Sequence, residues 1–231
     1  MIEPASLVIA DRAGPPLTAG LVEPPLRTGA KERPRRIVVI GEFNSGKTTL
    51  VNALLGSPVL PTSFTKHTAY PTVVGFAAKP ALRAELIGRR RVAVPWSAID
   101  EAPAPHVRRL HVGMPLDRLK TLRAVDTPGF GLGDGDDEAR TLRACRGADT
   151  VIWCTPAMQA WKASELRTWL SLPRAMRQRG VLAVTFMDAL PSKGDAGRLL
   201  ARLAADAGPH FRRIVTFSAH GTLAAPGGEL G

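Results

Sequence analysis

The chain has 231 residues, 45% of them hydrophobic, which is enough for one domain with a substantial core and short for two. Its N-terminal residues are acidic where a secretory signal is basic, and no apolar stretch approaches the roughly 18 residues of a membrane span. Without a signal or a span, we expect a soluble, cytoplasmic protein. The net charge is +11, and residues 79–124, with 10 Lys/Arg and 4 Asp/Glu, form a basic region.

That basic region, residues 79–124, fits a contact with an anionic membrane surface or a nucleic acid, or an arginine-rich face that is simply solvated. A peripheral position at a membrane is therefore the alternative to a purely cytoplasmic one. Cys145 and Cys154 show no metal-ligand spacing, which favours a reducing compartment and ordinary packing.

Along the chain, residues 1–34 are rich in proline and predict a flexible N-terminal tail. The domain is expected over residues 35–221, followed by a second flexible tail at 222–231. The predicted strands are 37–40, 71–77, 107–112, 122–125, 151–154, 181–186 and 214–217, with a hairpin over 82–94 that turns near Gly88. The predicted helices are 47–55, 138–145, 162–172 and 195–207. Alternating strands and helices indicate an α/β domain with a mostly parallel sheet and helices on both faces.

The first candidate site is a loop between the strand 37–40 and the helix 47–55. Residues 41–48 read Gly-Glu-Phe-Asn-Ser-Gly-Lys-Thr, which matches the pattern G-x-x-x-x-G-K-[ST]. Backbone N–H groups in such a loop close around phosphate oxygens, and the helix that follows adds its positive end. Lys47 then meets the outer phosphates and the Thr48 hydroxyl ligates Mg²⁺, so the expected ligand is a nucleoside triphosphate with its metal. The expected nucleotide-binding residues of this loop are Gly41, Glu42, Phe43, Asn44, Ser45, Gly46, Lys47, Thr48 and Thr49.

A second motif follows the strand 122–125. A magnesium triphosphate site needs an acid at the end of a neighbouring strand, and Asp126-Thr127-Pro128-Gly129 supplies one there. Asp126 can hold Mg²⁺ through a water, and Gly129 can present its N–H to the γ-phosphate. Paired with the loop at 41–48, this motif points to a GTPase rather than a generic ATPase.

Three segments of the chain, "GEFNSGKTTLVNALLG", "HTAYPT" and "AVDTPGF", together resemble the dynamin-like large GTPases, particularly the bacterial members. The similarity covers about residues 35–220. It implies a Ras-like P-loop domain that binds and hydrolyses GTP, with switch loops that depend on the γ-phosphate. The hairpin over 82–94 and the strand 107–112 would then form an extra β insert between the first switch and the Asp-Thr-Pro-Gly motif.

The resemblance assigns the remaining contacts less strongly. Thr68 stands where the family has the threonine that closes over magnesium and the γ-phosphate, and Thr65 is the alternative. The family's base motif, Thr/Asn-Lys-x-Asp, is replaced by Thr185-Phe186-Met187-Asp188. Asp188 would accept hydrogen bonds from guanine, with Phe186 in place of the lysine stem, and Ser218-Ala219 resembles the second base-contacting loop. The expected metal ligands are Thr48, Thr68 and Asp126.

The catalytic set implied by the resemblance is Lys47, Thr48, Thr68 and Asn44. Phe130 follows Gly129 where small signalling GTPases have a water-aligning glutamine, and because a phenyl ring cannot orient water, slow hydrolysis is expected. Asn44 resembles the asparagine of potassium-activated GTPases, so K⁺ is a candidate second cation. The alternative is that Asn44 only fixes the loop through a local hydrogen bond.

Three functions remain open at this point: a GTPase switch, a non-hydrolysing nucleotide-gated scaffold or subunit of a larger assembly, and an ATP-using P-loop protein. The resemblance also implies a helical stalk, and only "AHGTLAAPGGELG" follows the last predicted strand. We therefore expect one sheet face to lack cover and to need a docked tail, a protein partner or a homodimer across the nucleotide face, with GTP and GDP as the small ligands.

Overall fold

A computed structural model of the chain describes residues 8–10, 33–62, 70–99, 101, 104, 106–130 and 135–218. The strands are β1 (Val8–Ala10), β2 (Arg35–Gly41), β3 (Thr72–Phe76), β4 (Ala81–Leu86), β5 (Arg91–Ala93), β6 (Val107–Met114), β7 (Leu122–Asp126), β8 (Thr150–Pro156), β9 (Gly180–Thr185) and β10 (Arg213–Thr216). The α-helices are α1 (Lys47–Leu55), α2 (Gly135–Cys145), α3 (Ala163–Ser171), α4 (Arg174–Arg177) and α5 (Lys193–Asp206). Short 3-10 segments are η1 (Trp96–Ile99), η2 (Asp117–Lys120), η3 (Ala157–Gln159), η4 (Met187–Ala189) and η5 (Gly208–His210).

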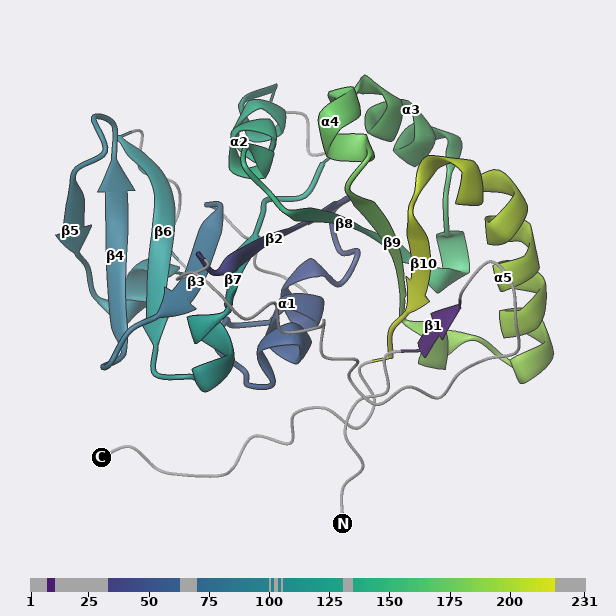
Figure 1. Ribbon diagram of the computed structural model, residues 1–231, viewed down its shortest axis with the longest axis horizontal. Coiled ribbons are helices and arrows are strands. Elements are labelled where there is room, and N and C mark those ends of the chain that lie inside the picture. The colour runs from purple at the N-terminus through teal and green to yellow at the C-terminus, as the bar shows by residue number, and fades with distance from the viewer. Residues whose placement is uncertain are drawn as a thin grey trace, which may run out of the picture.

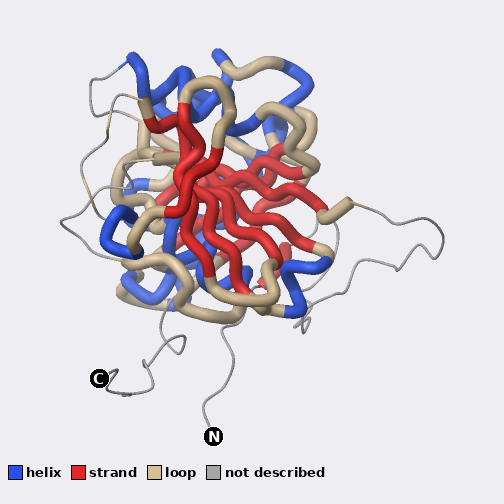
Figure 2. The backbone as a smooth tube through the Cα atoms, turned by 90° about the vertical axis from the view of Figure 1, so that its left-hand side faces the viewer, coloured by secondary structure: helices blue, strands red, loops and turns tan. Residues whose placement is uncertain are grey.

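One ten-stranded sheet runs through the molecule in the order β1-β10-β9-β8-β2-β7-β3-β6-β4-β5. Helices lie on both sides of it (Figure 1), and Figure 2 shows the strands passing through the middle of the fold. The block from β10 to β7 is parallel, which confirms the expected α/β architecture. The predicted β insert is β3 to β6, and it joins the parallel block through an antiparallel β3–β7 pair.

Strand β2 lies inside the sheet, so both of its faces are covered and its apolar run is continuous. Val38 and Ile40 face a cluster that contains Trp153, Trp169 and residues of α5. Val39 faces the opposite cluster, which includes Leu50, Val51 and Leu55 of α1. All three β2 residues have 0% exposed surface. Burial on both faces fixes the position of the strand from which the residue 41–48 loop emerges.

The expected uncovered sheet face is not observed among the described residues. Ile152 and Val215 lie on the α1 side of the sheet, with 7% and 8% of their surface exposed. They belong to the same cluster as Phe217, just beyond β10. The large hydrophobic side chains that are exposed lie elsewhere, for example Ile87 in the β4–β5 turn and Met158 in η3.

Three residues of the predicted N-terminal tail form a strand. Val8–Ala10 pairs antiparallel with β10, with Val8 opposite Thr216 and Ala10 opposite Ile214. This short strand covers the backbone edge that β10 would otherwise leave open on that side. None of the helices in the described ranges is long and apolar enough to span a bilayer.

Local sequence explains where helix α1 ends and where helix α5 begins. Gly56 closes α1 in the left-handed conformation, with φ 68°, and its N–H donates to the carbonyl groups near the end of the helix. The Ser192 hydroxyl accepts a hydrogen bond from the Asp195 N–H at 3.1 Å and caps α5. The predicted bounds of α1 coincide with the observed ones, and those of α5 differ by two residues at the start and one at the end.

A pair of glycine substitutions tests the packing of the helical layer. A Cβ on Gly180 would lie 2.5 Å from Cζ2 of buried Trp169, so Gly180→Ala should lower the free energy of unfolding by about 1–3 kcal/mol. Gly197 in α5 has open space around it, so Gly197→Ala should raise that free energy by about 0.4–1 kcal/mol. Urea denaturation followed by circular dichroism measures both changes. Equal stability of Gly180→Ala and the parent would contradict the packing described here.

Candidate functional site

The phosphate-loop motif, residues 41–48, connects β2 to α1, as predicted. Gly41 has φ +150°, and a Cβ there would lie 2.5 Å from the Cys154 carbonyl oxygen and 2.8 Å from Ser45 Oγ. Gly46 has φ +79° and precedes the first helical residue. Glycine at these two positions lets the chain pass closely against β8 and turn into the helix.

The start of α1 is suited to an anion. Lys47, Thr48 and Thr49 form its first turn, which contains no acidic residue, and the N-cap residue Gly46 has no side chain that could cap the helix. First-turn N–H groups together with the helix dipole attract negative charge. The start of α1 is therefore compatible with the phosphate contact that the sequence predicts at this position.

Lys47 lies inside the loop, with 7% of its surface exposed. Its Nζ donates a hydrogen bond to the Glu42 carbonyl oxygen at 2.7 Å. Burial lowers the pKa of Lys47, while the nearby Asp126 carboxylate opposes that shift. The ammonium group is thus held beside the loop backbone, next to an acid from another strand.

That acid is Asp126, at the end of β7. The Thr48 hydroxyl donates a hydrogen bond to Asp126 Oδ2 at 2.7 Å, which joins the two predicted motifs. Asp126 is opposite Val39 in the parallel β2–β7 ladder, and only 1% of its surface is exposed. A hydroxyl and a carboxylate at one buried point form a set of hard oxygen donors, the kind that Mg²⁺ prefers. The residues present therefore fit a magnesium site.

The segment that follows Asp126 runs along the phosphate loop and is tied to it. The Phe130 N–H donates to the Gly41 carbonyl oxygen at 3.1 Å, and the Phe43 N–H donates to the Phe130 carbonyl oxygen at 3.2 Å. Between them, a Cβ on Gly129 would lie 2.7 Å from Phe43 Cα and 3.2 Å from Lys47 Nζ. Only glycine permits this close approach, which brings Gly129 next to the lysine of the loop.

The Phe130 side chain points into the core. Its ring stacks on Trp153 with centroids 5.5 Å apart and an interplanar angle of 16°. Trp153 also makes edge contacts with Trp161 and Trp169, so the residue after Gly129 is anchored in a cluster of aromatic rings. Trp161 and Trp169 are both part of the buried core on this side of the sheet.

The Glu42 side chain has a structural role that the sequence did not reveal. Its carboxylate accepts hydrogen bonds from Lys162 Nζ at 2.5 Å and from Ser164 Oγ at 2.8 Å. Both partners lie at the start of α3, which follows β8 and η3. The second residue of the phosphate loop therefore fixes the loop to a neighbouring helix, and only its backbone is available to a phosphate.

A buried acid on the same helix supports this contact. Glu165 has no exposed surface and accepts hydrogen bonds from Trp153 Nε1, Thr155 Oγ1 and the Lys162 N–H, each at 2.9 Å. Burial raises the pKa of Glu165, while these three donors favour its charged form. The only sequence signal for this arrangement is the capping-box spacing of Lys162 and Glu165, with lysine where serine or threonine is usual.

The predicted base-recognition loops meet beside the phosphate loop. Thr185 ends β9, and its hydroxyl donates to the Ser45 carbonyl oxygen at 2.9 Å. The Phe186 ring would be 3.3 Å from a Cβ on Gly46, so it packs over the start of α1. The Met187 N–H donates to the Phe217 carbonyl oxygen at 3.4 Å, which brings the loop of exposed Asp188 next to Ser218.

Some predicted residues are less constrained or lie elsewhere. Asn44 has φ 56°, its side chain is exposed, and it makes no hydrogen bond to the other described residues. The loop-fixing alternative for Asn44 therefore has no support in the described part of the chain. Thr65, Thr68 and Ala219 lie outside the described residues.

The two cysteines lie in the core as free thiols. Burial raises the pKa of Cys145 and of Cys154 to about 12, which keeps both protonated at neutral pH. Cys154 contributes its carbonyl oxygen, and not its sulfur, to the wall of the phosphate loop.

Comparison with known proteins gives a family match over most of the domain. The family model described as "Dynamin family" matches residues 37–186. "Dynamin-like protein 2" of Campylobacter jejuni is 30% identical over 136 residues, which is 56% of this chain and 22% of that protein. "Isoniazid-induced protein IniC" of Mycobacterium tuberculosis is 34% identical over 133 residues, which is 54% of this chain and 27% of that protein. The chain thus spans about a quarter of the length of these relatives.

Solved structures show the same fold. A structure of an oligomerised bacterial dynamin pair matches with a TM-score of 0.58 and 21% identity, over 80% of this chain and 30% of that one. The structure of Era from Aquifex aeolicus bound to GDP·AlF4⁻ matches with a TM-score of 0.51 and 16% identity, over 81% of this chain and 52% of that one.

Proposed function

This chain belongs to the dynamin family, and on that premise we propose that it binds GTP with Mg²⁺ and hydrolyses GTP to GDP and phosphate as a molecular switch. The observation that carries the proposal is the 2.7 Å hydrogen bond from Thr48 to Asp126, two residues 78 positions apart in the chain. It brings a phosphate loop and the acid of a second strand to one buried point. Such a pairing serves magnesium triphosphate chemistry and has no comparable purpose in a purely structural turn.

Each part of the site has a role in this proposal. The amides of residues 41–48 wrap the phosphates, Lys47 adds a positive charge, and Gly129 offers its N–H to the γ-phosphate. Thr48 would bind the metal directly and Asp126 through a water, with Thr68 as the proposed switch ligand. Mg²⁺ bound there would neutralise charge on the outer phosphate groups.

Guanine is the proposed base. Asp188 would accept hydrogen bonds from the guanine N–H groups, and the Phe186 ring, which packs over Gly46, would give the base an apolar surface. Ser218 and Ala219 would contribute the second base-contacting loop. The hydrogen bond from Thr185 to the Ser45 carbonyl supports this reading, because it fixes the base loop to the phosphate loop.

Hydrolysis needs a group that Phe130 does not provide. Because its ring is stacked on Trp153, it neither reaches the phosphate nor offers a hydrogen bond to water. Asn44, exposed in the loop, would help hold K⁺, and the cation would stabilise charge that develops on the transferred phosphate. A nucleotide-gated scaffold with negligible turnover is the second candidate function, and the buried Phe130 ring is the observation that favours it.

The wider assembly is proposed from the relatives. The bacterial dynamin structure matched here is that of an oligomerised pair, so we propose a homodimer or a protein partner across the nucleotide face. We propose a cytoplasmic protein, with a peripheral membrane position or a nucleic-acid contact through the basic region at 79–124 as the alternative.

Replacing the loop lysine tests the nucleotide site. Lys47→Ala should abolish measurable GTP binding, because it removes the charge beside the phosphates, and should leave the far-UV circular dichroism unchanged. Lys79→Ala, at an exposed position, is the matched control and should bind like the parent. Isothermal titration calorimetry with GTP and Mg²⁺ measures both, and an unchanged affinity of Lys47→Ala would refute the assignment.

Base selection is tested at Asp188. Asp188→Asn should weaken GTP binding about 10–100-fold, because each lost hydrogen bond to a charged group costs about 1.5–3 kcal/mol, and should improve binding of xanthosine triphosphate. Competition with ATP in the same titration identifies an ATP-using protein if ATP displaces GTP from the parent. A variant that keeps GTP affinity and ignores the xanthine nucleotide would rule Asp188 out.

Turnover in different salts separates the two candidate functions. Phosphate release from GTP should be about tenfold faster or more in KCl than in NaCl, because a cation of the right size near Asn44 stabilises the transition state. Asn44→Ala should remove this difference. Tight GTP binding with no turnover in either salt would support the scaffold instead.

A further inference from the structure

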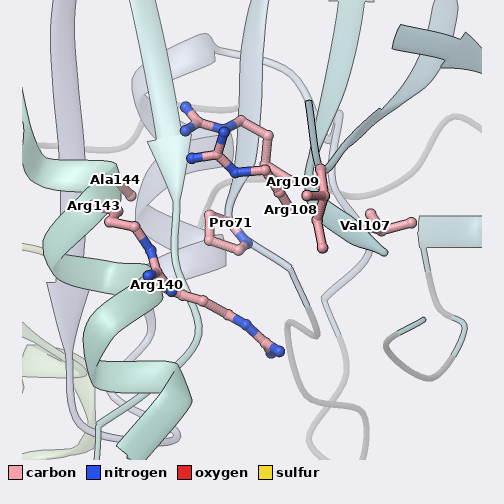
Figure 3. Close-up of a pocket in the computed structure, with 8 residues that line it drawn as sticks. Pro71, Val107, Arg108, Arg109, Arg140, Arg143 and Ala144 are labelled. Atoms are coloured by element: carbon pink, nitrogen blue, oxygen red, sulfur yellow. The ribbon is translucent and has the colours of Figure 1, made fainter. Parts of the chain in front are cut away.

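A pocket lies away from the nucleotide loop, between α2 and the start of β6, with a volume of about 250 Å³. Its wall includes four arginines, Arg108, Arg109, Arg140 and Arg143, together with Pro71 and Val107. In Figure 3, Arg140 and Arg143 come from the helix on one side, and Arg108 and Arg109 come from the strand on the other. Two elements far apart in the chain therefore place guanidinium groups around one cavity.

The pocket is separate from the site proposed for GTP. Ala144, another wall residue, accepts a hydrogen bond from Arg36 Nη2 at 2.9 Å, near the first residue of β2. The phosphate loop begins at Gly41, at the other end of the same strand. None of the described residues that line the pocket belongs to the motifs at 41–48, 126–129 or 185–188.

Among the described residues that line the pocket, four are arginines and none is acidic. The Glu85 carboxylate lies 3.4 Å from the lining residue Arg109, and it is shared with Arg91 at 3.6 Å and with His111 at 2.8 Å. Burial lowers the pKa of Arg36, and the positive charges of Arg109 and Arg123 lower it further. A bound anion would relieve this repulsion between like charges.

The chemistry and size of the pocket select the type of anion. A guanidinium group presents a planar fork of N–H donors that matches two oxygens of a phosphate group. The volume of about 250 Å³ is below the roughly 300–1,000 Å³ of pockets that hold drug-sized ligands, so a compact group fits better than a whole nucleotide. We propose that the arginine pocket between α2 and β6 binds the phosphate groups of a phosphorylated ligand, at about the size of a diphosphate.

The test uses the full chain with Lys47→Ala, so that the phosphate loop does not compete for the probe. Inorganic pyrophosphate, titrated by calorimetry at low salt, should bind at one site. Adding Arg108→Gln and Arg143→Gln should weaken binding at least tenfold. Among the described residues, neither arginine takes part in a hydrogen bond or ion pair of its side chain, so the fold should tolerate both changes. Arg212→Gln with Arg213→Gln removes the same charge from exposed positions six strands away and should leave the affinity unchanged.

Thermal unfolding gives an independent readout if calorimetric heats are small. Pyrophosphate should raise the melting temperature of the Lys47→Ala chain and of the Arg212/Arg213 control, and should not raise that of the Arg108/Arg143 variant. The proposal is overturned if pyrophosphate does not bind, or if it binds all three proteins equally. GTP binding by the parent is measured separately, so failure here leaves the proposed GTPase function untouched.

Vesicles identify the source of the phosphate. Phosphatidylcholine vesicles with phosphatidic acid should sediment the Lys47→Ala chain, with release by pyrophosphate and loss in the Arg108/Arg143 variant, if the ligand is a lipid headgroup. Pyrophosphate binding without sedimentation supports a soluble phosphorylated ligand in the same pocket. Sedimentation that neither pyrophosphate nor the two substitutions reduce counts against the pocket as the anion site.

Discussion

Parallel pairing between β2 and β7 is the constraint on which the site depends. Because the strands run in the same direction, the residues that follow their carboxyl ends meet at one edge of the sheet. The ladder places Val39 opposite Asp126, and the next turn of each chain then holds Thr48 against that carboxylate. Two further backbone hydrogen bonds, between Phe130 and the loop residues Gly41 and Phe43, continue the pairing past the end of the sheet.

The same contacts connect the site to the core. Phe130 gives its backbone to the phosphate loop and its ring to Trp153, which in turn donates to buried Glu165. Glu165 accepts the Lys162 N–H, and the Lys162 ammonium group reaches Glu42 in the loop. The loop is therefore enclosed by a closed path of contacts through α3 and the aromatic cluster. A change in packing at Trp153 would therefore alter the position of the phosphate loop, because each contact in this path joins two residues directly.

Much of the fold could be predicted because the signals are local. Strand β2 is indicated by the apolar run before Gly41, the loop by its glycines and lysine, and the end of α1 by Gly56. These signals all lie within about twenty residues of sequence. The motif at Asp126 is equally local, because it directly follows an apolar strand. What the sequence could not supply is the order and direction of distant strands, such as antiparallel β3 beside β7, and the pairing of β1 with β10.

Contacts between side chains that are far apart in the chain could not be predicted from the sequence either. The contacts of Glu42 with Lys162 and Ser164 join residues more than a hundred positions apart, and no pattern in either segment requires them. In the sequence, the arginines of the pocket between α2 and β6 indicate only a positive charge. The fold shows that they surround one cavity. In each case tertiary structure, which propensity and spacing do not encode, decided the outcome.

The long connection between β2 and β7 also has a consequence for biosynthesis. The glycine loop leaves the ribosome well before the strand that carries its acid, since Thr48 and Asp126 are 78 residues apart. In contrast, β4 and β5 are neighbours in the chain and can pair as a hairpin as soon as both have emerged. The nascent chain therefore passes through a stage at which the insert hairpin can form while the loop at 41–48 lacks the strand that carries Asp126, and the contact between the two motifs has to wait for later translation.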